Sequence, residues 1–306
     1  MKWRALTSGV LAAALLTGCA RSADPVERPG KKAAEAADRA ASHGPSGGGS
    51  YGPSGAGSHG REGAGSSGPE GAGSYGPEGA GERPYRRWGL TAPPAPAPKP
   101  SARPPAPRPP GRGLTPVLDH VPTSDRVVFL TYDDGAEKDP RFVDMVRELR
   151  LPVSMFLTDS VVGPGYGHFA RLRSVGASIQ NHTLDHPALR GLPYAGQRTE
   201  ICGQQDKLHS RFGIRPRLFR PPYGTYDTTT LRAAADCGLS AVVLWRVSVE
   251  NGELAFTEGE RRLRPGDIVS VPSGRPTGET LTERTVRLLR EIQEQGLTVG
   301  RLEDYL

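Results

Sequence analysis

The sequence predicts an α/β fold from about residue 114 to the C-terminus, with a parallel sheet curled into a small or irregular barrel. Apolar, strand-like runs alternate with helical segments there, and polar clusters directly follow several of the strands. Glycine and proline also become much rarer beyond residue 113. Strand–helix alternation requires helical crossovers, so we expect active residues just past the carboxyl ends of the strands.

The first half of this region predicts three strands and three helices. Its first strand is an apolar run that ends in polar residues, and the helix after it places Phe142, Met145, Val146 and Leu149 on one face. The third strand runs directly into Asn181. In chain order the elements are strand 126–131, helix 140–151, strand 152–157, helix 167–175, strand 177–180 and helix 197–212.

The second half continues the alternation, with turn residues that mark its boundaries. Gly238 and Gly296 close two helices, and the Pro265-Gly266 turn precedes a strand. The elements are strand 216–219, helix 228–237, strand 240–245, strand 267–271, helix 280–295 and strand 297–300.

Residues 19–113 have the composition of a disordered linker. Residues 20–113 hold 20 of the 40 glycines and 17 of the 30 prolines. Four octapeptides fill 50–81 (SYGPSGAG, SHGREGAG, SSGPEGAG, SYGPEGAG), with almost nothing apolar to bury, which predicts a flexible coil. Residues 91–111 are proline-rich and predict a stiffer polyproline II spacer.

The net charge of +6 lies outside the predicted domain. Residues 1–19 carry +2, residues 20–113 carry +5, and residues 114–306 carry −1. A basic protein invites a nucleic-acid hypothesis, but the part that can fold is nearly neutral. We therefore expect no nucleic-acid partner.

The N-terminus predicts an export signal over residues 1–18. A short basic start is followed by an apolar stretch too short to span a bilayer, and it ends in Leu16-Thr17-Gly18-Cys19. This ending resembles the bacterial lipobox, in which the cysteine receives a lipid. We expect a protein anchored by Cys19 outside the cell membrane; the alternative is a plain secretory signal with an incidental cysteine.

Two adjacent carboxylates, Asp133 and Asp134, follow the first strand. Placing two negative charges beside an apolar strand costs free energy unless a charged group interacts with them. Neighbouring side chains of an extended segment point in opposite directions, so one can bind a metal while the other handles a proton. The simpler alternative is an Asp-Gly turn.

His182 and His186 follow the third strand, four residues apart. On one face of a helical turn they can share a metal ion. With a carboxylate from another strand end they predict an Asp/His/His site, whose three protein ligands and open position are typical of catalytic zinc.

Arg220, Pro221, Pro222 and Tyr223 follow a fourth strand. An arginine there can pair with a carboxylate and keep it ionised, and the Tyr223 backbone can donate to a developing oxyanion. The alternative is a rigid turn with a solvated arginine.

In this order the clusters resemble the polysaccharide deacetylases of the NodB-homology type, carbohydrate esterase family 4. The resemblance covers roughly residues 125–306, through PVSMFLTDS, GASIQNHTLDHPAL and GIRPRLFRPPYGTYD. It implies a distorted (β/α)7–8 barrel. It also implies removal of N-acetyl, and in some members O-acetyl, groups from chitin, chito-oligomers, peptidoglycan or xylan.

The resemblance also implies a role for each residue. A divalent metal, most often zinc and otherwise cobalt or nickel, is held by Asp134, His182 and His186. Asp133 is then the general base that deprotonates water, and Arg220 tethers it. The Tyr223 backbone N–H and the metal stabilise the oxyanion.

Two stretches depart from the family pattern. Ser248 and Asn251 stand where the family has aspartates that tune an acid, and Pro272 stands where it has the histidine that protonates the leaving amine. Proline carries no titratable group, so the metal half of the site is retained and the acid half is lost.

Three outcomes remain open. The protein could be a slow deacetylase in which protonated Asp133 returns its proton to the leaving group. It could act on an O-acetyl ester, which needs the acid less. It could also be a pseudoenzyme that binds glycan at the cell surface. The residues that could substitute as the acid are Tyr166, His168, Glu250 and His209.

Cys202 and Cys237 remain besides Cys19. We favour a structural disulfide between them, which an extracytoplasmic location permits, over two buried free thiols. We expect a monomer.

Overall fold

The computed structural model describes residues 83–101, 107–274 and 278–306. The expected signal peptide, Cys19 and the octapeptide repeats lie outside the described residues. None of the helices in these described stretches is long and apolar enough to cross a bilayer.

The strands and helices alternate as the sequence predicts. The strands are β1 (Val117–Leu118), β2 (Val127–Asp134), β3 (Ser154–Leu157), β4 (Ser178–Asn181), β5 (Leu218–Phe219), β6 (Ala241–Val243), β7 (Val247–Glu250), β8 (Glu253–Phe256), β9 (Ile268–Val271) and β10 (Thr298–Val299). The helices are α2 (Pro84–Arg87), α3 (Pro140–Leu149), α4 (Asp159–Val162), α5 (Tyr166–Ser174), α6 (Tyr194–Phe212), α7 (Thr228–Asp236) and α8 (Leu281–Glu294). Two 3₁₀ turns cover Pro222–Gly224 and Leu302–Tyr305.

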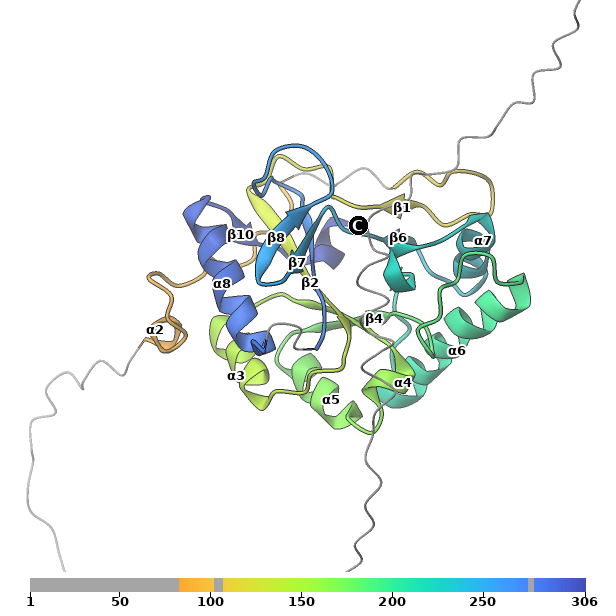
Figure 1. Ribbon diagram of the computed structural model, residues 1–306, viewed down its shortest axis with the longest axis horizontal. Coiled ribbons are helices and arrows are strands. Elements are labelled where there is room, and N and C mark those ends of the chain that lie inside the picture. Colours follow the sequence, from red (N-terminus) through yellow and green to blue (C-terminus); the bar gives the residue numbers. More distant parts are fainter. Residues whose placement is uncertain (1–82, 102–106, 275–277) are drawn as a thin grey trace, which may run out of the picture. The chain divides into compact units, whose positions relative to one another are not determined.

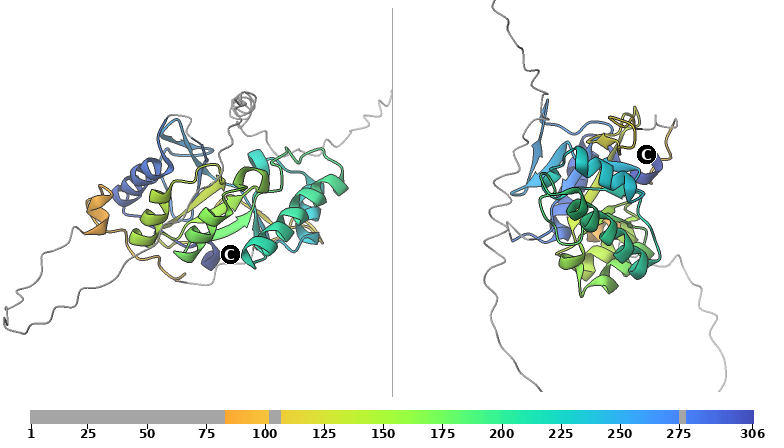
Figure 2. Two further views of the ribbon diagram at one scale, coloured as in Figure 1. Left: turned by 90° about the horizontal axis from the view of Figure 1, so that it is seen from below. Right: turned by 90° about the vertical axis from the view of Figure 1, so that its right-hand side faces the viewer.

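The sheet is strongly curled, so the fold is a half-barrel with helices outside it (Figure 1, Figure 2). Its strand order is β1-β6-β5-β4-β3-β2-β9-β7-β8, and β10 also pairs with β2. Among these strands only β7 and β8 pair antiparallel. The predicted distorted barrel is confirmed.

Side chains of the strands alternate between two apolar layers. The inner layer includes Phe129 from β2, Phe156 from β3, Val243 from β6 and Ile268 from β9. Val128, Leu130 and Tyr132 of β2 point the other way and pack in the layer that includes α3 and α8. Thr131 and Asp133 therefore face the interior, with Phe129, and lie nearer the carboxyl end of β2.

The structure contains a hairpin that the sequence analysis missed. β7 and β8 form it, and its turn contains Asn251 and Gly252, both with positive φ (48° and 84°). Ser248, aligned with an acid-tuning aspartate, lies in β7 and donates to Glu250 Oε1 over 2.8 Å. Asn251, the second aligned position, lies in the turn.

Part of the expected linker packs against the domain. Tyr85, Trp88 and Leu90 are buried in the outer apolar layer. Arg290 of α8 donates to the Gly89 carbonyl, at 3.0 and 2.7 Å. The packed structure therefore extends further toward the N-terminus than residue 114.

Candidate metal centre and active site

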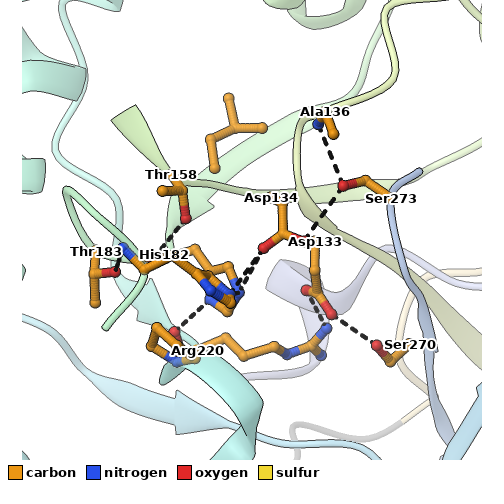
Figure 3. A network of polar contacts seen from close by, with 12 residues as sticks. Asp133, Asp134, Ala136, Thr158, His182, Thr183, Arg220, Ser270 and Ser273 are labelled. Carbon is orange, nitrogen blue, oxygen red and sulfur yellow. Dashed lines mark hydrogen bonds and ion pairs between the residues drawn. The ribbon is translucent and has the colours of Figure 1, made fainter. Parts of the chain in front are cut away.

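The backbone at the end of β2 directs the two adjacent aspartates to different places. Asp133 keeps the strand alternation and faces the interior of the half-barrel, with Thr131. Asp134 has a left-handed conformation (φ 63°), which departs from the extended geometry of the strand. Its carboxylate reaches the histidine pair, and the carboxylate of Asp133 does not (Figure 3).

The two histidines come together through an irregular loop. The predicted helical turn is wrong, because residues 182–190 contain no helix. Thr183 and His186 have positive φ (74° and 60°), and the Thr183 hydroxyl accepts the His186 backbone N–H over 3.1 Å. These contacts fold the loop so that both rings face Asp134.

Three potential ligand atoms converge at one point. Asp134 Oδ1 lies 3.2 Å from His182 Nε2 and 3.0 Å from His186 Nε2, and the two Nε2 atoms lie 3.2 Å apart. Asp134, His182 and His186 thus form a group that could hold a metal ion. This donor set and its compactness fit a divalent cation of the zinc type.

The surroundings orient these ligands. His182 Nδ1 lies 2.7 Å from the Arg220 carbonyl oxygen, so Nδ1 carries the proton and donates it, which leaves Nε2 as the ligand atom. Burial tends to raise the pKa of Asp134, but His182 and His186 outweigh it when their Nε2 atoms carry protons, because they then donate to Asp134 and hold its pKa well below its usual range; a bound metal would take the place of those protons. The carboxylate is therefore ionised, as a metal ligand must be.

Arg220 is fully buried and holds Asp133. Its guanidinium donates to Asp133 Oδ1 over 2.7 Å and to Thr131 Oγ1 over 2.8 Å. It also donates to the backbone carbonyls of residues 243 and 244. Its Cζ atom lies 4.4 Å from the ring centroid of Phe156 and 5.3 Å from that of Trp245. These contacts satisfy the buried cation and fix the position of the Asp133 carboxylate.

Tyr223 reaches the site through its ring. The ring lies edge-on to His186, with centroids 4.7 Å apart, and is partly exposed. Tyr223 has a positive φ of 59° in the turn that Pro221 and Pro222 introduce.

The site also contains two serines that were not predicted from the sequence. Ser270 Oγ donates to Asp133 Oδ2 over 2.7 Å, and Ser273 Oγ donates to Asp134 Oδ2 over 3.3 Å (Figure 3). A signal was present for Ser270, since strand alternation places it on the same inward face as Ile268.

Pro272 directly follows β9, between these two serines. The four residues considered as substitute acids have different surroundings. Tyr166 donates its hydroxyl to Asp159, and His168 is buried with its ring 5.1 Å from Phe169. Glu250 accepts from Ser248 at the β7–β8 hairpin, and His209 is exposed on α6.

Cys202 of α6 and Cys237 at the end of α7 are joined by a disulfide bond. The bond connects two helices that also pack against each other, beside β5 and β6.

Residues 120–242 match the family model of polysaccharide deacetylase. The chain is 67% identical over 197 residues to the uncharacterized protein SCO4760 of Streptomyces coelicolor, covering 64% of this chain and 79% of that one. It is 29% identical over 198 residues to a chitooligosaccharide deacetylase of Bradyrhizobium sp., covering 58% and 89%. Residues 120–242 therefore belong to a polysaccharide deacetylase domain.

The fold also has a counterpart among solved structures. A solved family 4 carbohydrate esterase from Bacillus anthracis superposes with a TM-score of 0.53 at 20% identity, covering 62% of this chain and 86% of that one. The matched segment, 120–242, contains Asp133, Asp134, both histidines and Arg220. It ends before Ser248 and Pro272, where we expect the sequence to depart from the family pattern.

Proposed function

We propose that the protein is a metal-dependent hydrolase that removes N- or O-linked acetyl groups from a cell-wall or extracellular polysaccharide. The observation that carries this proposal is the convergence of Asp134 Oδ1 with His182 and His186 Nε2, beside a carboxylate, Asp133, that Arg220 holds in place. The chitooligosaccharide deacetylase among the relatives supports an acetylated sugar as the substrate.

The chain's own residues divide the chemistry between them. Asp134, His182 and His186 would hold the divalent cation, which supplies Lewis-acid polarisation of an acetyl carbonyl and a more acidic water. Asp133 takes the proton of the attacking water, and Arg220 keeps it at the edge of the ligand cluster. The Tyr223 backbone N–H donates to the oxyanion that develops on the acetyl group.

Pro272 bears on the leaving group. General acid assistance is worth about 10²- to 10⁴-fold in rate, and proline supplies none. Asp133, once protonated, is the group in this cluster that can return a proton. An alkoxide leaves more readily than an amide nitrogen. Without a general acid at residue 272, the rate of deacetylation should therefore fall less for an O-acetyl ester than for an N-acetyl group.

Pro272 also favours a second candidate function. In this alternative the site binds an acetylated glycan without turnover, and the protein is a non-catalytic lipoprotein of the cell surface. The retained ligand cluster then serves binding only.

Acetate release decides between the two functions. The full chain, loaded with zinc, is incubated with acetylated chito-oligosaccharides, peptidoglycan and acetylxylan, and the His182→Ala and Asp134→Ala variants serve as controls. We expect release that both variants and chelation abolish. Release from no substrate, together with retention on insoluble glycan, would establish the binding function instead.

Membrane anchoring through Cys19 completes the proposal. Expressed in bacteria, the wild-type chain should partition into the membrane fraction, and Cys19→Ala should not. Equal partitioning of both proteins would favour the plain secretory signal.

A further inference from the structure

The end of β9 contacts both aspartates of the site. Ser270 reaches Asp133, and Ser273, three residues later, reaches Asp134 (Figure 3). One short segment therefore contacts the expected base and the expected carboxylate ligand through separate hydroxyls.

Ser270 completes the fixation of Asp133. Arg220 donates to Oδ1 and Ser270 donates to Oδ2, each over 2.7 Å, so opposite oxygens of the carboxylate are held from two sides. Ser270 is buried, and β9 pairs it in register with Thr131 of β2, which also contacts Arg220. A carboxylate held at both oxygens cannot rotate without losing one hydrogen bond.

Ser273 acts on the other aspartate. Asp134 Oδ1 faces the histidines, and Oδ2 accepts the Ser273 hydroxyl over 3.3 Å. The same hydroxyl accepts the Ala136 backbone N–H over 3.3 Å, which connects it to the chain just after Asp134. A partner on the second oxygen of a ligand carboxylate sets which oxygen faces the metal.

Arg284 of α8 fixes the segment that carries Ser273. This buried guanidinium donates to the carbonyls of Pro272 and Gly274, over 2.7 and 2.6 Å, and pairs with Glu137 Oε2 over 2.8 Å. Glu137 Oε1 also accepts the first backbone N–H of α8, that of Leu281. The end of β9 and the loop after β2 are thus held to one another through a buried ion pair.

We propose that Ser270 and Ser273 are positioning residues that keep the two adjacent aspartates in separate roles, Ser270 for the base and Ser273 for the metal ligand. The inference rests on the proposed deacetylase function and adds to it the residues that hold its geometry.

Zinc affinity tests the Ser273 half without any turnover. Zinc binding to the full chain is measured by competition with a fluorescent chelator. Ser273→Ala should raise the zinc Kd about tenfold, at the lower end of the range for partners of metal ligands. Ser270→Ala should leave the Kd unchanged. An unchanged Kd in Ser273→Ala, or an equal loss in Ser270→Ala, overturns the assignment.

Kinetics and crystallography test the Ser270 half. On the substrate that the wild type deacetylates, Ser270→Ala should lower kcat about tenfold and change KM less than twofold, and Ser270→Thr should restore kcat. If the wild type releases no acetate, the proposed function fails, and the Ser270 assignment is decided by a crystal structure of zinc-loaded Ser270→Ala. A carboxylate of Asp133 rotated away from Arg220 supports the assignment, and an unmoved one overturns it.

Ser154→Ala is the matched control. Ser154 is, like Ser270, a buried serine that donates to a carboxylate, that of Glu303 over 2.9 Å, but it lies at the amino end of β3. Its removal should leave zinc affinity and kcat unchanged. A loss equal to that of Ser273→Ala or Ser270→Ala would mean that any buried serine has the same effect, and the proposal would be wrong.

Discussion

At the scale of single residues, the positive φ of Asp134 separates two chemically identical side chains. Asp133 remains with Arg220 and Ser270 inside the half-barrel, while Asp134 meets His182 and His186. The sequence predicted that adjacent carboxylates would do different work, because strand neighbours point in opposite directions. Strand alternation placed Ser270 on the inward face but did not identify its partner, and Ser273 lies in the loop after β9, where no spacing rule marks it.

The two aspartates should respond differently to the same substitution. Asp134→Asn removes an anionic ligand and should weaken zinc binding by at least tenfold, whereas Asp133→Asn should retain zinc and lose acetate release. Equilibrium dialysis with zinc and an acetate assay measure the two properties. Equal zinc loss in both variants would contradict the separation of roles.

His168 predicts a pH dependence of stability. Burial, with Arg171 and Lys138 nearby, lowers its pKa to about 4 from 6.5, although Asp139 opposes the shift. Between these values the unfolded chain binds a proton that the folded chain excludes, so the free energy of unfolding should decrease as the pH falls from about 6.5 to about 4. The loss is at most about 3.5 kcal/mol, at about 1.4 kcal/mol for each pH unit.

Urea unfolding of the wild type and His168→Leu at several pH values checks this dependence. Other groups titrate identically in both proteins, so the difference between the two curves isolates His168. The variant should lose less stability over this window, and parallel curves would contradict the prediction.

At the scale of elements, local sequence patterns predicted most boundaries within a few residues. The exceptions have physical causes. Residues Val247–Glu250 alternate apolar and polar directly before Asn251-Gly252, which is a strong hairpin signal, but this stretch was compared only with the acid-tuning aspartates of the family pattern. The helical turn predicted for His182 and His186 does not form, because the left-handed conformations of Thr183 and His186 bring the two rings together instead. Such conformations at residues other than glycine are hard to predict from sequence.

The disulfide between α6 and α7 should stabilise the domain. It closes a loop with a sequence separation of 35, for which chain entropy gives about 4 kcal/mol at most. The double variant Cys202→Ser/Cys237→Ser should therefore unfold at lower urea concentration and retain its zinc affinity, because neither cysteine contacts the ligand cluster.

Reduction of the wild type should reproduce the loss in stability, and reduction of the double variant should change nothing. An oxidised wild type with two thiols that react with alkylating agents would contradict the bond itself.

At the scale of the whole molecule, the boundary between linker and domain is the feature that composition concealed. Three apolar residues, Tyr85, Trp88 and Leu90, stand in a region dominated by glycine and proline, so an average over the region indicates a linker. Their burial against the outer layer is a tertiary effect. Trp88 Nε1 also donates to Glu148 of α3 over 2.8 Å.

A fragment of residues 114–306 should therefore be less stable than one of residues 83–306. Full burial of an apolar side chain contributes about 1.5–3 kcal/mol, so losing three should lower the free energy of unfolding by several kcal/mol. Urea unfolding of the two fragments and the full chain measures the difference. The fragment of residues 83–306 should match the full chain, and Trp88→Ala in the full chain should reproduce part of the loss. If the fragment of residues 114–306 is as stable as the full chain, the segment that contains α2 packs against the domain without contributing to its free energy of unfolding.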